Sequence, residues 1–180
     1  MEEEAISVLS PHGVGLAPVT LVLGGARSGK SRFAESMLGG GTYVATAGPG
    51  DAEMRARIAE HRRRRGDGWR TVEAPLDLVA ALQRAAADRQ PILLDCLTLW
   101  LSNLMGAGRD VEAEAARLAD CLRALGSPVV LVSNEVGQGI VPSNALARRF
   151  RDHAGALNQQ VAAIAGQVFL VTAGLPARLK

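Results

Sequence analysis

The sequence predicts an α/β fold in which helices flank a mostly parallel β-sheet, built as one domain over residues 18–180. Short runs of Val, Ile and Leu alternate with helix-like stretches along the chain, as in right-handed βαβ units. A length of 180 residues suits one hydrophobic core. Hydrophobic residues make up 48% of the chain but aromatic residues only 3%, so aliphatic side chains must build that core.

The amino-terminal half begins with an expected flexible tail at residues 1–17. The first strand is expected at residues 18–23, a β-branched run that ends at two glycines. Apolar residues at helical spacing then predict a helix at residues 31–38, which three consecutive glycines terminate. The further elements expected in this half are a strand at 42–46, an Ala-, Glu- and Arg-rich helix at 51–65 and a short strand at 69–73.

The carboxy-terminal half continues the alternation. Its expected strands are apolar runs at residues 91–96, 128–133 and 168–172. Its expected helices are an Ala-rich amphipathic stretch at 76–89, two stretches at 97–105 and 111–125 that a Gly-containing loop separates, and a long one at 144–164.

Charge and cysteine content limit the kinds of function that the protein can be expected to have. A net charge of +2 is too small to indicate nucleic acid or an anionic membrane as a partner. Cys96 and Cys121 lack metal-ligand spacing and are expected to be buried structural thiols. An acidic start without a long apolar run argues against a signal peptide, and no stretch is long enough for a membrane span. A cytoplasmic location is therefore expected.

A phosphate-binding loop is the strongest motif. Residues 24–31 (GGARSGKS) match G-x-x-x-x-G-K-[ST] between an expected strand and an expected helix, as a P-loop NTPase requires. Its backbone N–H groups and the helix N-terminus would bind the phosphates of ATP or GTP. Lys30 would reach the β- and γ-phosphates, and Ser31 would ligate Mg²⁺. The loop residues are Gly24, Gly25, Ala26, Arg27, Ser28, Gly29, Lys30 and Ser31. The alternative is a glycine-rich turn that binds nothing.

Asp95 ends the apolar run of residues 92–94 and is a candidate second ligand for the same Mg²⁺. Its alternative role is to cap the following helix. These features do not by themselves separate a kinase from a nucleotidyltransferase or a nucleotide switch.

A basic segment surrounds one histidine. Arg57, His61 and Arg65 share a helix face by their i, i+4 spacing, and further arginines lie between them. Such a cluster can bind a triphosphate and present an imidazole, kept neutral by the arginines, to its α-phosphorus. The alternatives are a solvated basic helix face and a nucleic-acid patch; the second lacks interleaved aromatic residues for stacking.

With these motifs in hand, the chain resembles the bifunctional adenosylcobinamide kinase / adenosylcobinamide-phosphate guanylyltransferase family of cobalamin biosynthesis. The resemblance runs from about residue 19 to the end. Beyond the phosphate loop and residues 53–65, it is carried by LLDCLTLWLSNL at 93–104, by the family-specific NEVGQGIVPSNALARRFRD at 134–152 and by LVTAG at 170–174.

The resemblance implies a P-loop α/β fold, usually assembled as a homotrimer, and two reactions. A nucleoside triphosphate phosphorylates adenosylcobinamide, and GMP is then transferred from GTP to adenosylcobinamide phosphate through a guanylylated histidine. That catalytic histidine would be His61. The catalytic residue of the kinase step would be Lys30. Besides the phosphate loop, the implied nucleotide contacts are Thr46, Ala47, Gly48, Arg62, Arg63, Arg64, Arg65, Glu73 and Asp95.

Two other hypotheses stay open at the level of sequence. A monofunctional small-molecule P-loop kinase would carry His61 incidentally and form no covalent intermediate. A non-catalytic switch or RNA-associated protein would need loops that sense the γ-phosphate, or salt-dependent binding in a basic groove.

Overall fold

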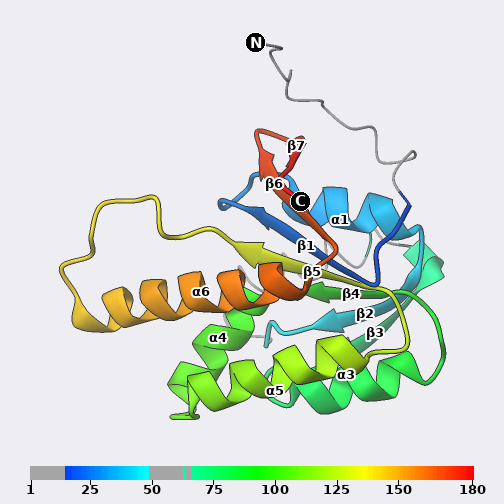
Figure 1. Cartoon of the computed structure of the whole chain (residues 1–180), viewed down its shortest axis with the longest axis horizontal. Coiled ribbons are helices and arrows are strands. Elements are labelled where there is room, and N and C mark those ends of the chain that lie inside the picture. Colours follow the sequence, from blue (N-terminus) through cyan, green and yellow to red (C-terminus); the bar gives the residue numbers. More distant parts are fainter. Residues whose placement is uncertain (1–14, 49–62, 64–65) are drawn as a thin grey trace.

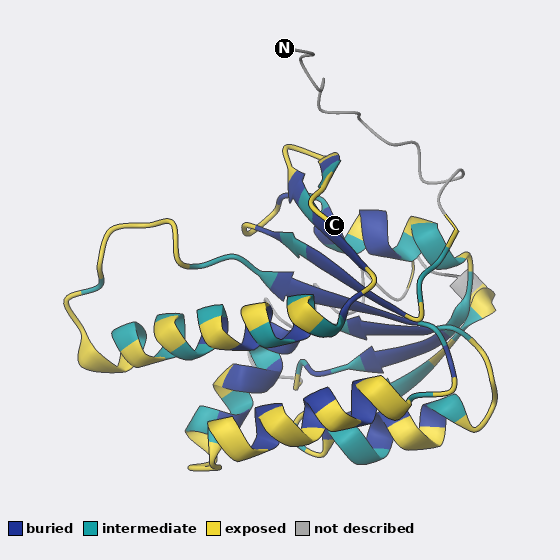
Figure 2. Cartoon of the chain, in the orientation of Figure 1, coloured by how far each residue is buried: buried dark blue, intermediate teal, exposed yellow. Residues whose placement is uncertain are grey.

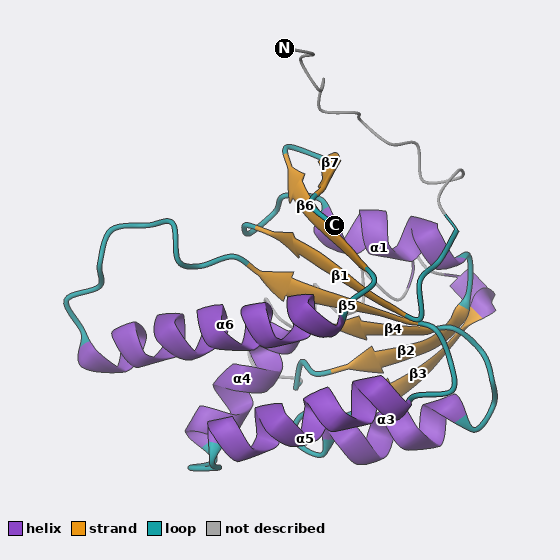
Figure 3. Cartoon of the chain, viewed as in Figure 1, coloured by secondary structure: helices purple, strands orange, loops and turns teal. Residues whose placement is uncertain are grey.

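A seven-stranded sheet forms the centre of the molecule (Figures 1 and 3). The computed structural model describes residues 15–48, 63 and 66–180. The strands are β1 (Val19–Gly24), β2 (Gly41–Ala45), β3 (Trp69–Glu73), β4 (Ile92–Asp95), β5 (Val129–Asn134), β6 (Gln167–Thr172) and β7 (Leu175–Arg178). The described helices are α1 (Lys30–Leu38), α3 (Leu78–Ala86), α4 (Leu97–Gly106), α5 (Val111–Ala124) and α6 (Ala145–Ile164), with a 3₁₀ turn, η2 (Gly66–Gly68).

The strand order is β3-β2-β4-β5-β1-β6-β7. All neighbouring strands are parallel except β6 and β7, which form an antiparallel hairpin. The predicted mostly parallel α/β fold of the P-loop NTPase type is therefore confirmed. Parallel strands place their carboxyl ends at one edge of the sheet, which is where ligands bind in such folds.

The strand β7 is absent from the sequence prediction. Its Pro176 cannot donate to a ladder, which argues against a strand except at a sheet edge, and β7 is an edge strand. The two residues of the hairpin turn, Ala173 and Gly174, have φ angles of 52° and 81°. Positive φ at both turn positions suits the right-handed twist of the flanking strands.

The other described elements lie close to their predicted positions. The six predicted strands and the helices α1, α4, α5 and α6 agree with the structure to within one residue at each end. Only α3 is clearly shorter than predicted, because the chain leaves the helix at Ala87 and Arg89 adopts a φ of 53°. The predicted helix at residues 51–65 lies outside the described residues apart from Arg63, which is helical.

Two hydrophobic cores sandwich the sheet (Figure 2). The larger core lies under α3, α4, α5 and α6 and includes the fully buried Trp100. The smaller core lies under α1, where Phe33 packs edge-on against Phe169 of β6 with ring centroids 5.2 Å apart. Because Phe33 anchors α1 on the sheet, the start of α1 has a fixed position next to the end of β1.

Gln167, 6% exposed, links the chain before β1 to β6. Its side chain accepts hydrogen bonds from the Ala17 N–H at 3.3 Å and the Thr20 hydroxyl at 3.2 Å, and it donates to the Gly15 carbonyl at 2.8 Å. Residues 15–17 are thus bound to β6, whereas the rest of the expected tail, residues 1–14, lies outside the described residues.

Cys96 and Cys121 are free and buried, as predicted. Among the described helices, none is both long enough and apolar enough to cross a bilayer.

Candidate active site

The phosphate loop joins β1 to α1 at the carboxyl edge of the sheet. The loop turns through the Ser28 N–H, which donates to the Gly25 carbonyl at 3.3 Å, and through Gly29, which has a φ of 95° and caps α1. Only glycine adopts such a φ without strain. The helix α1 thus begins directly at the loop, where the N–H groups of its first turn form an anion-binding end.

Close packing behind the loop explains why Gly24 is a glycine. A Cβ atom on Gly24 would lie 2.5 Å from Ser28 Oγ and 2.6 Å from the Val171 carbonyl oxygen. The turn between β6 and β7 braces the loop from the same side, because the Gly174 N–H donates to the Ser28 carbonyl at 2.8 Å. The hairpin that the sequence prediction missed therefore supports the phosphate loop. Gly25 differs: a Cβ there would meet nothing within 4 Å.

Lys30 brings a buried positive charge to the loop. Its ammonium donates to the Gly25 carbonyl at 3.0 Å, and the residue is only 6% exposed. Ser31 follows it in the first turn of α1 and is half-buried. The structure thus places the Lys30 ammonium against the loop, with Ser31 next to it in the first turn of α1.

Asp95 lies at the end of β4, half-buried, and its Oδ2 atom accepts a hydrogen bond from the Tyr43 hydroxyl at 3.2 Å. The charges of Asp95 and Lys30 both affect the pKa of the neighbouring Cys96 thiol. Burial and then the charge of Asp95 raise the pKa of the Cys96 thiol to about 11, while Lys30 opposes them. Asp95 and Lys30 are therefore both within electrostatic range of this one thiol.

The alternative role of Asp95, capping the next helix, is not realised in the structure. The cap residue of α4 is Cys96, and no side chain makes a capping hydrogen bond there. The Asp95 carboxylate instead accepts a hydrogen bond from Tyr43 of the neighbouring strand β2.

Thr46 holds the ends of two strands together. Its hydroxyl donates to the Cys96 carbonyl at 2.7 Å and accepts from the Cys96 N–H at 2.8 Å, and Thr46 is fully buried. The Asn103 amide then donates to the Thr46 carbonyl at 2.8 Å. Of the residues that follow, Ala47 is half-buried and Gly48 is exposed. The Thr46 hydroxyl thus fixes the loop that presents its neighbours.

Glu73 is exposed at the end of β3, on the outer edge of the sheet. Among the basic residues predicted to bind nucleotide, Arg63 is exposed and helical. His61, Arg62, Arg64 and Arg65 lie outside the described residues.

Asn134 and Glu135 also lie at the loop, although the sequence analysis used them only for the family resemblance. Asn134 is paired with Gly24 in the register of β1 and β5, and the Glu135 N–H donates to the Gly24 carbonyl at 3.1 Å. The signal that finds them is the one that found Asp95: a polar residue directly after a buried strand of a parallel sheet.

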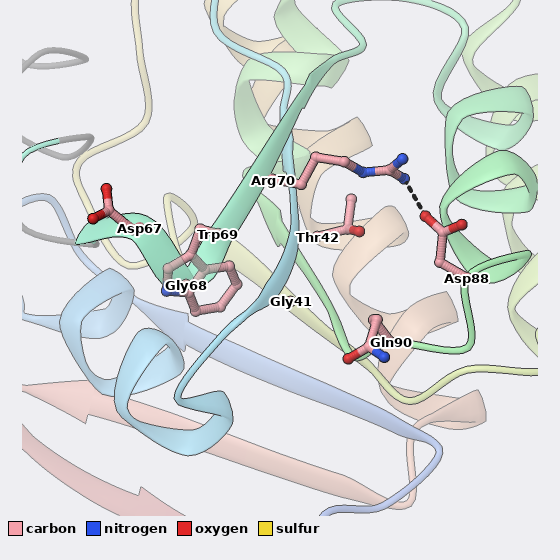
Figure 4. Close-up of a pocket in the computed structure, with 8 residues that line it drawn as sticks. All are labelled: Gly41, Thr42, Asp67, Gly68, Trp69, Arg70, Asp88 and Gln90. Carbon is pink, nitrogen blue, oxygen red and sulfur yellow. Dashed lines mark ion pairs between the residues drawn. The ribbon is translucent and has the colours of Figure 1, made fainter.

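A separate pocket of about 520 Å³ lies at the amino ends of β2 and β3 (Figure 4). Arg70 and Asp88 form an ion pair at its wall, with Nη2 and Oδ2 2.7 Å apart. It is lined by Gly41, Thr42, Asp67, Gly68, Trp69, Arg70, Asp88 and Gln90. The phosphate loop, Asp95 and Glu135 lie at the opposite ends of the strands, so this pocket is not the nucleotide site. Within the described residues there is no cluster of three or more His, Cys, Asp or Glu side chains suited to a metal.

Comparison with known proteins decides the family. The family model described as cobinamide kinase / cobinamide phosphate guanyltransferase matches residues 20–179. The chain belongs to this family. The match spans the phosphate loop, Asp95 and Glu135, and also the sequence of the basic segment around His61. Membership in the cobinamide kinase / guanyltransferase family confirms the predicted enzyme class.

Three curated relatives support the same family assignment. The chain is 48% identical over 166 residues to the bifunctional adenosylcobalamin biosynthesis protein CobP of Pseudomonas aeruginosa, covering 89% of this chain and 96% of the relative. It is 42% and 41% identical over 178 residues to the bifunctional proteins CobU of Escherichia coli and Salmonella typhimurium, covering 89% of this chain and 98% of each relative. The word bifunctional in all three names supports the two-reaction prediction over a monofunctional kinase.

Proposed function

We propose that this protein phosphorylates adenosylcobinamide with ATP or GTP and then transfers GMP from GTP to adenosylcobinamide phosphate, giving adenosylcobinamide-GDP and pyrophosphate. One observation carries the proposal: in a member of the cobinamide kinase family, the phosphate loop with its buried Lys30 follows β1, and Asp95 ends β4 at the same edge of the parallel sheet. Both reactions use a triphosphate, and the loop N–H groups, the start of α1 and the Lys30 ammonium at this edge of the sheet can bind an anion.

In the kinase step, the loop N–H groups and the start of α1 bind the triphosphate, and the Lys30 ammonium neutralises charge on the transferred phosphoryl group. Gly25 to Ser31 form this cradle, with Arg27 exposed on its outer side. Gly24 contributes through packing, since its missing side chain lets Ser28 and Val171 approach.

A magnesium ion fits the side chains at this site. Ser31 offers a hydroxyl and Asp95 a half-buried carboxylate of which one oxygen is oriented by Tyr43. Hard oxygen ligands of this kind suit Mg²⁺, which keeps several waters and needs only one or two protein ligands beside the phosphates. When bound, the ion would neutralise charge on the β- and γ-phosphates.

In the guanylyltransferase step, the His61 imidazole attacks the α-phosphorus of GTP and pyrophosphate leaves, after which the phosphate of the corrinoid takes GMP from His61. Arg62, Arg63, Arg64 and Arg65 would stabilise charge on the leaving pyrophosphate. Thr46, Ala47, Gly48 and Glu73 would contact the nucleotide at the ends of β2 and β3. What supports this step is the basic sequence around His61 and the bifunctional names of the relatives.

The active assembly is proposed to be a homotrimer, as the family resemblance implies. Exposed apolar side chains support a subunit interface on the segment after β5 and the start of α6: Ile140 is 97% exposed, Val141 63% and Leu146 55%. Light scattering on the wild-type protein and an Ile140→Asp variant tests this, since a fully active monomer would contradict it. The cytoplasm, which holds the GTP and ATP pools, is the proposed location.

The proposed function is tested by a two-stage reaction followed by mass spectrometry. Purified protein with adenosylcobinamide, ATP and Mg²⁺ should form adenosylcobinamide phosphate, and later addition of GTP should convert it to adenosylcobinamide-GDP with one pyrophosphate released. Phosphorylation without GMP transfer would establish a monofunctional kinase instead, and neither product would refute both activities.

A further inference from the structure

Glu135 lies beside the phosphate loop without a role in the function proposed above. Its backbone N–H donates to the Gly24 carbonyl at 3.1 Å, and the Lys30 ammonium donates to the carbonyl of the next residue, Gly25, at 3.0 Å. Glu135 and Lys30 are thus anchored to consecutive peptide groups of the loop. The Glu135 backbone is therefore bound to the same part of the loop as the Lys30 ammonium, the group that would hold the γ-phosphate.

The carboxylate of Glu135 is oriented by its own loop. Its Oε1 atom accepts a hydrogen bond from the Gly137 N–H at 2.6 Å, and the residue is half-buried. A Cβ atom on Gly137 would lie 2.9 Å from that oxygen, so the glycine leaves room for the carboxylate. A carboxylate has two acceptor oxygens, and the second makes no hydrogen bond with the described residues.

We propose that the Glu135 carboxylate is the general base of the kinase step. This inference rests on the proposed kinase activity. The hydroxyl oxygen of adenosylcobinamide forms a bond to the γ-phosphorus, the bond from that phosphorus to the β-phosphate bridging oxygen breaks, and the nucleoside diphosphate leaves. The hydroxyl proton passes to the Glu135 carboxylate and from there to water.

Two other carboxylates at this edge of the sheet are less suited to that task. Asp95 is engaged by the Tyr43 hydroxyl and is the proposed ion ligand. Glu73 ends β3, which β2, β4 and β5 separate from β1. Four strand spacings place it ~19 Å from the phosphate loop. Glu135 follows β5, the immediate neighbour of β1.

A competing explanation is that Glu135 only shapes its loop through Gly137. The substitution Glu135→Gln separates the two roles, because an amide oxygen still accepts the hydrogen bond from the Gly137 N–H but is not a base. GMP transfer provides an internal control: the acceptor in that step is already a phosphate, so no hydroxyl has to lose a proton.

The test measures both steps separately, with Glu135→Gln beside the exposed α5 control Glu112→Gln. We expect Glu135→Gln to lower kcat for phosphorylation of adenosylcobinamide by about 100-fold or more. The KM for ATP and the rate of GMP transfer to supplied adenosylcobinamide phosphate should stay within about twofold. Kinase turnover within about threefold of wild type, or equal loss of both steps, would overturn the proposal.

A second pair of variants keeps the test valid if Glu135→Gln folds poorly. Gly137→Ala introduces a methyl group 2.9 Å from the carboxylate, whereas a Cβ on Gly139 in the same loop meets nothing within 4 Å. Kinase turnover should fall in Gly137→Ala and not in Gly139→Ala; equal rates in the two would count against a positioned base. Wild-type protein without kinase activity would instead refute the proposed function itself.

Discussion

The Lys30 ammonium and the Gly25 carbonyl oxygen lie 3.0 Å apart, so the first residue of α1 folds its charge back onto the loop that precedes the helix. Lys30 is 6% exposed. A charge held so far from water interacts strongly with an anion placed in the loop.

This arrangement predicts that Lys30→Ala lowers kinase kcat by about 100-fold or more, because the variant lacks the cation that neutralises the transferred phosphoryl group. The exposed neighbour Arg32 provides the control, and Arg32→Ala should keep activity within about twofold. Thermal melting of both variants verifies folding. Normal turnover in folded Lys30→Ala would remove Lys30 from the mechanism.

Gly24→Ala should destabilise the protein by about 1–3 kcal/mol, because its methyl group would collide with the Val171 carbonyl, a backbone atom that cannot easily move. Gly25→Ala has open space and should change the free energy of unfolding by less than about 0.5 kcal/mol. Urea unfolding of the two variants measures the difference. Equal stability would show that the packing behind the loop is not as tight as described.

Asp95→Asn should raise the Mg²⁺ concentration needed for half-maximal kinase activity, because a neutral amide binds the ion more weakly than a carboxylate. The amide oxygen can still accept from the Tyr43 hydroxyl, so the melting temperature should change little. Tyr43→Phe is the complementary control, because it removes this hydrogen bond and keeps the Asp95 charge; its Mg²⁺ requirement should therefore stay close to that of the wild type. A loss of stability in Asp95→Asn that accounts for the whole loss of activity would favour a structural role.

The two thiols should react slowly in the folded protein. Burial raises the pKa of Cys121, and burial together with Asp95 raises the pKa of Cys96 to about 11 from its ordinary value of 9.0. The thiolate is the reactive form, so alkylation by iodoacetamide at pH 8 should be far slower in native than in urea-unfolded protein and should accelerate as the pH rises. The thiols ionise at a lower pH in the unfolded protein than in the folded protein. The free energy of unfolding should therefore fall as the pH rises above about 9. Prompt native labelling at pH 8 would contradict their burial.

Most of the described fold could be predicted because its buried strands are continuous aliphatic runs with clear glycine or proline boundaries. The aliphatic runs before Asp95 and before Gly24 each predict a strand whose ends lie within one residue of the observed ends. The hairpin strand β7 could not be predicted, because Pro176 is tolerated there only through its edge position, which depends on tertiary structure.

The candidate site was only partly accessible from sequence. Local spacing predicts the place of Lys30 and Ser31, because motif and helix start coincide. The position of Glu135 directly after a buried strand places it at the ligand edge of the sheet, but its hydrogen bond to Gly24 depends on the register of β1 and β5. The hydrogen bonds between the Thr46 hydroxyl and the Cys96 backbone also depend on tertiary structure, because the two residues follow different, neighbouring strands.

The central claim, GMP transfer through His61, is tested most directly by intact-mass spectrometry of the protein after incubation with GTP and Mg²⁺. We expect a mass increase of one GMP moiety that is labile to acid and stable to alkali, as for a phosphoramidate. His61→Ala should abolish the adduct and GMP transfer while phosphorylation of adenosylcobinamide persists, because the phosphate loop is intact. Formation of the adduct by His61→Ala at the wild-type rate would show that the nucleophile is another residue.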